Sequence, residues 1–138
     1  MKKSGFQFVR PYLKKLVFTE NNQFDMGEKA IEMQNEVSVE VEKKAEEKKA
    51  IVTLNFKVNQ GKKDVPFELE AVISAGFKWT AGDEKQIDRM LSVNAPAVLL
   101  SYLRPIISQI TNSSKFPAYD IPFLNFADKD LLSEKTTD

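Results

Sequence analysis

The sequence predicts an α+β fold: a four-stranded antiparallel sheet in a meander, followed by a long kinked helix and a short C-terminal helix. Two observations carry this prediction. Apolar and polar residues alternate through much of the first 80 residues, which is the period of strands with one buried face. From residue 83 onward the period becomes that of a helix. The 138 residues suit one domain and contain no repeat or linker, so we expect a single domain over residues 1–138.

The first two predicted strands differ in how regular they are. Residues 6–18 alternate around Pro11, and because proline cannot donate to a ladder, this strand should bend or lie at a sheet edge. Residues 21–29 have the composition of a loop. A second strand is expected over 33–41, and the charged run 43–49 is interpreted as its connection to the next strand, although its composition would also suit a helix.

The third and fourth strands have the clearest patterns. Residues 52–58 place apolar side chains on one face, and Asn59-Gln60-Gly61 indicates a tight turn. Residues 65–79 keep a period of two throughout, with Glu68 and Glu70 on the polar face. Strands joined by short turns favour an antiparallel meander.

A helix is expected over residues 83–112. Asp83 suits the N-cap position, and Asn94-Ala95-Pro96 indicates a break and restart, since proline is tolerated in a first turn. Pro105 lies within the helix and should kink it. Beyond the helix, Leu131 and Leu132 would belong to the short final helix.

The predicted helix is apolar over more than one face, which is wider than contact with one sheet requires. Either the tail covers the additional residues, or the helix is buried twice, against its own sheet and against another subunit. We favour the second interpretation, because a chain of this length has little else to cover both faces. The expected oligomer interface consists of Leu99, Leu103, Ile106, Ile107 and Ile110.

Two predicted loop segments are unusually apolar. Loops usually lie on the surface, so aromatic, Met and Ile side chains there either fix the loops to the core or line an open groove. Methionine suits a groove that accepts many sequences, because its side chain is flexible and polarisable. The candidate groove residues are Phe24, Met26, Ile31, Met33, Phe116, Tyr119, Phe123 and Phe126.

A row of glutamates follows the polar face of the predicted sheet. Such a row is usually a solvated surface, and the alternative is a docking patch for a basic partner, with Glu70 as the foremost candidate. The row consists of Glu40, Glu42, Glu68 and Glu70.

Composition disfavours several classes of function. Without His or Cys, a Ser-His-Asp triad, a thiolate nucleophile and the ligands that zinc prefers are all missing. With 20 basic and 20 acidic residues, nothing drives the chain toward nucleic acid or an anionic membrane. No phosphate-binding or calcium loop is present, so we expect no cofactor and no metal. A small carboxylate-dependent enzyme on an α+β scaffold stays open as an alternative.

The hydrophobic runs do not predict a membrane protein. The opening Met1-Lys2-Lys3 is basic, but the apolar run of a signal peptide does not follow it. The sequence contains no stretch of about 18 consecutive apolar residues, which is the length that a membrane span requires. We therefore expect a cytoplasmic protein without membrane insertion.

Three stretches in order resemble the SecB family of protein-export chaperones. Residues 6–14, Phe-Gln-Phe-Val-Arg-Pro-Tyr-Leu-Lys, are similar to that family's first strand and its Arg-x-Tyr-x-Lys spacing. Residues 67–82 are similar in pattern to its fourth strand and exit, with Ala75-Gly76 where the family has glycines. Residues 94–126 are the most specific match, carrying Tyr102, Arg104, Ile107, Phe116-Pro117 and Leu124-Asn125-Phe126.

This resemblance implies a homotetramer, a dimer of dimers, whose long helices pack between dimers. It also implies a hydrophobic groove that holds unfolded secretory precursors without nucleotide and passes them to the SecA motor. Broad binding of this kind is physically coherent, because apolar contacts and strand edges require no fixed sequence.

Two departures from the family pattern bear on partners. Met33 stands where the family has a Trp, so the selectivity of the groove should differ. Lys15 and Thr19 stand at two positions where the family's SecA-docking surface is acidic, whereas Glu70 matches a third. Some SecB-like proteins instead chaperone the antitoxin of a toxin–antitoxin pair, which is the alternative function. The sequence does not identify the clients.

Overall fold

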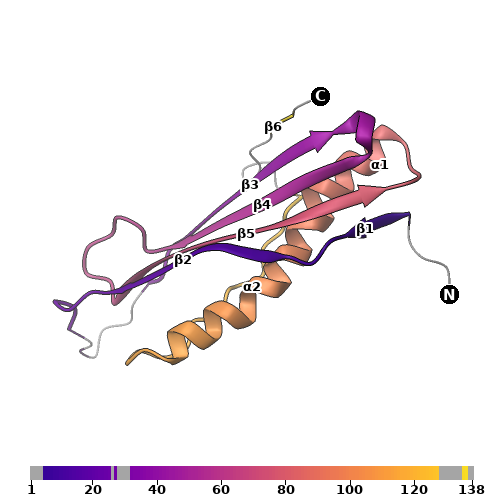
Figure 1. Cartoon of the computed structure of the whole chain (residues 1–138). Coiled ribbons are helices and arrows are strands. Elements are labelled where there is room, and N and C mark those ends of the chain that lie inside the picture. The colour runs from indigo at the N-terminus through magenta and orange to yellow at the C-terminus, as the bar shows by residue number, and fades with distance from the viewer. Residues whose placement is uncertain (1–4, 26, 28–31, 128–134, 137–138) are drawn as a thin grey trace.

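A computed structural model describes residues 5–25, 27, 32–127 and 135–136, and shows a twisted sheet lying over one long helix (Figure 1). Neighbouring strands follow the order β1 and β2, then β5, β4, β3 and β6. The strands are β1 Phe6–Phe8, β2 Tyr12–Glu20, β3 Asn35–Lys44, β4 Lys49–Val58, β5 Phe67–Trp79 and β6 Lys135–Thr136.

The predicted α+β class, with an antiparallel sheet and a long helix, is confirmed. β3, β4 and β5 form a meander, but β2 pairs with β5 and not with β3, so the prediction that all four strands follow in order is wrong at that point. The reason lies in the connections: a long segment joins β2 to β3 and can cross the end of the sheet, whereas shorter connections, residues 45–48 and 59–66, join β3, β4 and β5.

The first predicted strand is interrupted around Pro11, the residue that was expected to bend it or to place it at a sheet edge. β1 and β2 are separate strands on the same neighbour, β5, and Val9 between them still donates its N–H to the Gly76 carbonyl at 2.8 Å. Because β1 and β2 have no further strand on their outer side among the described residues, Pro11 lies at a sheet edge.

The inner face of the sheet forms the core. Directly opposed pairs on β4 and β5, such as Leu54 with Ile73 and Phe56 with Ala71, are fully buried. The predicted 43–49 connection is shorter than expected, because β3 continues to Lys44 and β4 begins at Lys49. A short 3-10 turn fills the space between, and Lys48 closes it in the left-handed region at φ 52°.

The helical region runs from α1 (Glu84–Arg89) through a π-helical turn (Met90–Asn94) into α2 (Ala95–Asn112). Asp83 is the N-cap, as predicted: its carboxylate accepts from the Gln86 N–H at 2.8 Å, and the Gln86 side chain accepts from the Asp83 N–H. The break predicted at residues 94–96 is replaced by the wide π turn, so the chain stays helical. Helical geometry also continues through Pro105.

One row of α1 and α2 faces the sheet at a spacing of four residues. The helical run is as long and as apolar as a membrane span, but this row is buried on the sheet, which is the packing of a core helix. The row consists of Ile87, Leu91, Ala95, Leu99, Leu103 and Ile107.

The chain beyond residue 127 is described only at β6, which pairs in parallel with β3 at Glu42 and Lys43. Leu131 and Leu132, predicted as a short final helix, lie outside the described residues.

Candidate functional site

After α2 the chain turns back along the helix as a return segment, residues 113–127. Arg104 on α2 holds this segment: one guanidinium nitrogen donates to the Ile121 carbonyl and the other to the Pro122 carbonyl at 3.0 Å. Because one planar group donates to two successive carbonyls, it fixes the direction of the segment as well as its distance from the helix.

A buried hydroxyl makes the second tether. Thr111 near the end of α2 is fully buried and donates to the Ile107 carbonyl at 2.8 Å. The same oxygen accepts from the Tyr119 N–H at 2.7 Å, so the helix end and the return segment share one polar atom. Tyr119 then donates its phenol O–H to the Asn35 side chain at the start of β3. Burial raises the pKa of Tyr119, and the hydrogen bond to Asn35 offsets part of that rise.

These tethers leave an apolar cavity of about 220 Å³ between the return segment and the end of the sheet. Phe67 and Phe116 form part of its wall, with ring centroids 6.1 Å apart, and Phe24 meets Phe116 edge-on at 6.2 Å. The lining residues are Met33, Pro66, Phe67, Phe116, Pro117, Ala118 and Tyr119.

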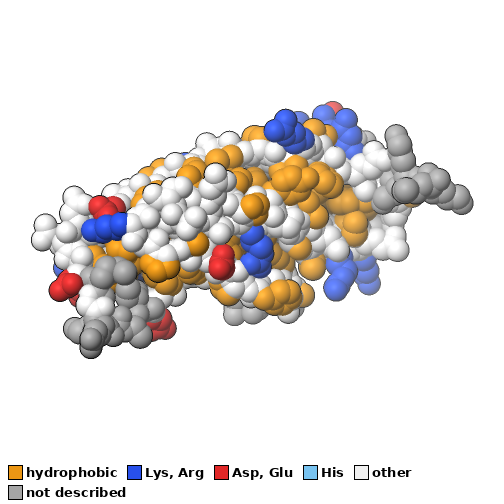
Figure 2. Space-filling view, turned by 90° about the horizontal axis from the view of Figure 1, so that it is seen from below, with side chains coloured by type: hydrophobic (Ala, Val, Ile, Leu, Met, Phe, Trp, Pro, Cys, Tyr) orange, Lys and Arg blue, Asp and Glu red, His pale blue; other side chains and the backbone are white. Residues whose placement is uncertain are grey.

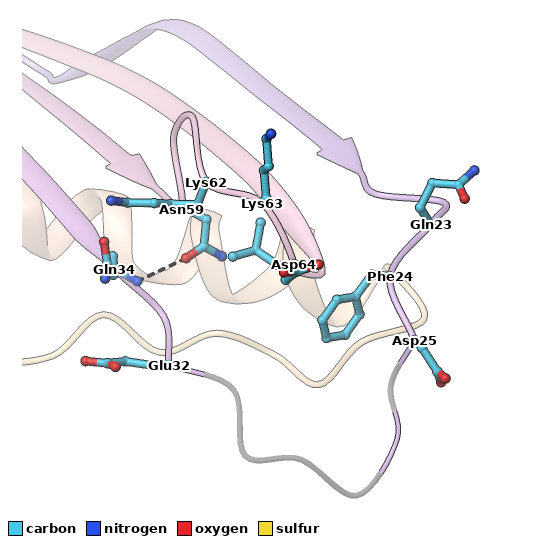
Figure 3. Close-up of a pocket in the computed structure, with 10 residues that line it drawn as sticks. Gln23, Phe24, Asp25, Glu32, Gln34, Asn59, Lys62, Lys63 and Asp64 are labelled. Carbon is cyan, nitrogen blue, oxygen red and sulfur yellow. Dashed lines mark hydrogen bonds between the residues drawn. The ribbon is translucent and has the colours of Figure 1, made fainter.

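A larger cavity, about 490 Å³ in volume, adjoins the apolar one (Figure 3). The two are neighbours along the chain, because Gln34 and Val65 line the larger cavity while Met33 and Pro66 line the apolar one. The turn between β4 and β5 supplies two lysines, and the segment before β3 supplies amide and acidic groups. The lining residues are Gln23, Phe24, Asp25, Glu32, Gln34, Asn59, Lys62, Lys63, Asp64 and Val65.

The carboxylates of the larger cavity do not suit acid–base catalysis. Asp25, Glu32 and Asp64 are all exposed, whereas the enzyme alternative requires two convergent, partly buried carboxylates. Among the described residues, no three acidic side chains gather into a possible metal site. The chemistry that this region offers is therefore contact with an apolar segment flanked by polar or charged groups.

The structure brings together four of the eight predicted groove residues: Phe24 lines the larger cavity, and Met33, Phe116 and Tyr119 line the apolar one. Phe126 is buried, and Phe123 is 88% exposed beyond the lining of either cavity. Met26 and Ile31 lie outside the described residues.

Sequence reasoning missed several lining residues. Phe67 has the alternation of a core strand, which hides its second contact with the cavity. The only sequence feature that could have identified three other lining residues is their position beside predicted groove residues or beside Phe67. These are Pro66, Pro117 and Ala118. For Asn59, the sequence predicted the start of a turn and not the contacts of its side-chain amide.

The residues predicted for an oligomer interface divide into two groups. Leu99, Leu103 and Ile107 are fully buried within the subunit against its own sheet. Ile106 and Ile110 are half-buried, so the predicted interface depends on these two.

Apolar side chains nevertheless reach the surface next to this helix. Tyr102 on α2 is 45% exposed and meets Phe8 of β1 in an edge contact, with ring centroids 6.3 Å apart. Leu13 on β2 is 40% exposed. Figure 2, seen from the side on which α2 lies, shows hydrophobic side chains gathered into patches over this surface.

The outer face of the sheet carries the predicted docking residue. Glu70 makes an ion pair with Lys15 across the β2–β5 ladder, with oxygen and nitrogen 2.9 Å apart. Lys57 is its direct neighbour on β4, and Glu68 accepts from the Gly61 N–H at 3.0 Å. The glutamate row is therefore interrupted by basic partners.

Comparison with known proteins bears on the family and the fold. The family model described as preprotein translocase subunit SecB matches residues 1–134. No curated protein matches the sequence significantly. The fold is similar to that of the Mycobacterium tuberculosis SecB-like chaperone Rv1957, solved with a ChAD peptide from the antitoxin HigA1, at TM-score 0.68, 13% identity, and 86% and 90% coverage of this chain and that one.

The fold is also similar, at a lower TM-score, to that of a second solved structure. It is a protein of unknown function from Streptococcus agalactiae, with TM-score 0.55 and 14% identity, covering 86% of this chain and 97% of that one. At these identities the structural likeness establishes the fold.

Proposed function

The chain belongs to the SecB family of chaperones, and we propose that it binds non-native polypeptide, without nucleotide, in the apolar cavity and its charged neighbour. We call the two cavities together the client groove. The observation that carries this proposal is the apolar cavity of about 220 Å³, kept open by polar tethers beside half-buried Phe24, Met33 and Tyr119.

An extended client chain fits such a surface. Its side chains alternate, so one can enter the apolar cavity while the next meets the polar groups around the larger cavity. The edge of β3 lies beside the groove, since Tyr119 bonds to Asn35 at the start of that strand. Among the described residues β3 has an outer neighbour only at Glu42 and Lys43, which supports main-chain pairing with a client along the rest of the edge.

We propose precursors for protein export as the principal clients, with delivery to SecA in the cytoplasm. An antitoxin client is the second candidate, and a specific contact favours it: Lys15 pairs with Glu70, so the acidic surface expected to dock SecA is partly neutralised. The mycobacterial chaperone, solved with an antitoxin peptide, supports polypeptide segments as ligands. An adjacent toxin–antitoxin gene pair would favour the second candidate.

We further propose a homotetramer, a dimer of dimers, with contacts on the surface of Phe8, Leu13, Tyr102 and Ile106. Two exposed aromatic side chains, Tyr102 on the helix and Phe8 on the adjacent edge strand, form the kind of patch that another subunit covers. Light scattering at micromolar concentration tests this proposal, and a stable monomer would contradict it.

Refolding of a slow-folding reporter protein tests the function. A several-fold excess of the chaperone is expected to slow refolding without ATP. Replacing Met33, which lines the apolar cavity, by Ser should restore the rate while the oligomer stays intact. Tyr12→Ser, which removes an exposed aromatic side chain from the outer sheet face, is the matched control and should leave the slowing unchanged. An unchanged refolding rate with the wild-type protein would refute the function.

A further inference from the structure

A polar side chain lies fully buried at the border of the two cavities. Asn59 follows the last residue of β4, has φ 58°, and is 0% exposed. Its backbone N–H donates to the Gln34 carbonyl at 2.8 Å, and its carbonyl accepts from the Lys62 N–H at 3.1 Å. Asparagine tolerates the left-handed region better than most residues, which explains the turn but not the buried amide.

The side-chain amide connects three separate parts of the chain. Its oxygen accepts from the Gln34 N–H at 3.0 Å, drawn as a dashed line in Figure 3. Its nitrogen donates to the Phe67 carbonyl at 3.1 Å and to the Met33 sulfur at 3.3 Å. A backbone N–H on one side and a carbonyl on the other fix which end is oxygen, so the second amide hydrogen is directed at the sulfur.

We propose that Asn59 is a positioning residue that holds Met33 in the wall of the apolar cavity and thereby sets which client side chains the cavity accepts. Methionine is flexible and adapts to many shapes, so a fixed wall requires a tether. Asn59 provides one from the far side of the wall, without touching the client. This inference rests on the proposed function, because its consequence is measured as client binding.

A double-mutant cycle separates positioning from a general role in the turn. Asn59→Gly keeps a residue suited to φ 58° and removes the amide, whereas Met33→Leu keeps an apolar side chain and removes the sulfur acceptor. Each single variant is expected to weaken binding of an unfolded client peptide about fivefold, and the double variant no more than about fivefold, because both break one connection.

Glu68→Ala is the matched control, because Glu68 accepts from Gly61 in the same turn but does not contact Met33. Its effect on client binding should be small and additive with that of Met33→Leu. Additive losses in the Asn59–Met33 cycle would overturn the inference. Absence of client binding by the wild-type protein would instead overturn the proposed function.

The methyl resonance of Met33 gives a readout that a role in the turn alone would not move. In methyl-labelled protein, Asn59→Gly should increase the motion of the Met33 methyl group, whereas the methyl group of Met90, on the π turn, should not change. If Asn59→Gly does not fold, the wild-type protein still decides: a fixed Met33 side chain agrees with the inference, and one averaged over rotamers refutes it.

Discussion

The inner face of the sheet and the client groove are both apolar, but they are held together in different ways. On the inner face, pairs such as Leu54 and Ile73 are buried by direct apolar contact. Around the groove, polar groups make the connections: Thr111 and Asn59 bond to backbone of the groove walls, and Arg104 bonds to the return segment beyond them. The difference indicates that directional hydrogen bonds hold the walls of an open apolar cavity apart, because hydrophobic contact alone would bring the walls together.

The largest expected effect distinguishes the two faces of α2. Leu103→Asp should unfold the subunit, lowering the free energy of unfolding by about 3–5 kcal/mol, because it leaves an unpaired charge in the fully buried row. Thermal or urea unfolding followed by circular dichroism measures this loss. Tyr102→Asp is the control, since its exposed side chain should leave the subunit folded. Equal losses for the two variants would contradict the assignment of Leu103 to the core.

The next prediction compares two aromatic side chains of the return segment. Phe116→Ala should lower the free energy of unfolding by about 3 kcal/mol, because Phe116 is 4% exposed and packs on Phe67. Phe123→Ala should change it by less than about 0.5 kcal/mol, because its ring is exposed. Client affinity, measured by fluorescence anisotropy with a labelled unfolded peptide, should fall for Phe116→Ala, because Phe116 lines the apolar cavity, and stay nearly unchanged for Phe123→Ala, because Phe123 lines neither cavity. Similar unfolding curves for the two variants would contradict the packing of Phe116 in the core.

A smaller effect concerns one tether of the groove wall. The pKa of Tyr119 is raised in the folded state, so its contribution to stability is fully present below pH 10 and is lost as the pH rises through the folded-state pKa. Deprotonation removes the donor that bonds to Asn35. The stability difference between wild type and Tyr119→Phe should therefore shrink above about pH 10. A constant difference across that range would argue against the tether.

The smallest effect is expected on the outer face of the sheet. Glu70→Lys should leave client affinity nearly unchanged, because Glu70 lies away from both cavities and pairs with Lys15. It should alter binding of a basic partner, which titration calorimetry with SecA would measure. Equal loss of client and partner would show that the two surfaces are not separate.

Local patterns predicted the features that depend on near neighbours. The strict alternation of β5 identifies the buried face, and Asp83 predicts the helix start. The pairing of β2 with β5 joins residues about 50 positions apart, and no local pattern specifies it. The stripes of α2 indicated two apolar faces, but only the packing distinguishes Leu103, which is fully buried, from Ile106, which is half-buried.

The candidate site was predicted only in part for the same reason. Apolar loops indicated a groove, and Met33 and Phe116 do line a cavity. Phe123 has the same local signal and lies in solvent, because exposure depends on the path that Arg104 imposes on the return segment. The sequence predicted Asn59 only as a turn residue, because the Gln34 N–H that bonds to its side chain is 25 residues away.

The π turn between α1 and α2 gives the helix a tolerance to change in chain length. A π turn contains one residue more than an α turn. The helical turns before and after it therefore have the same relative orientation as in a continuous α-helix with one residue fewer. Deleting one residue between 90 and 94 should therefore leave Ile87 and Leu99 on the same side of the helix. The same deletion within α2 would rotate the buried row by about 100° and turn part of it toward solvent. The helix thus holds one turn from which evolution can remove a residue without rebuilding the core.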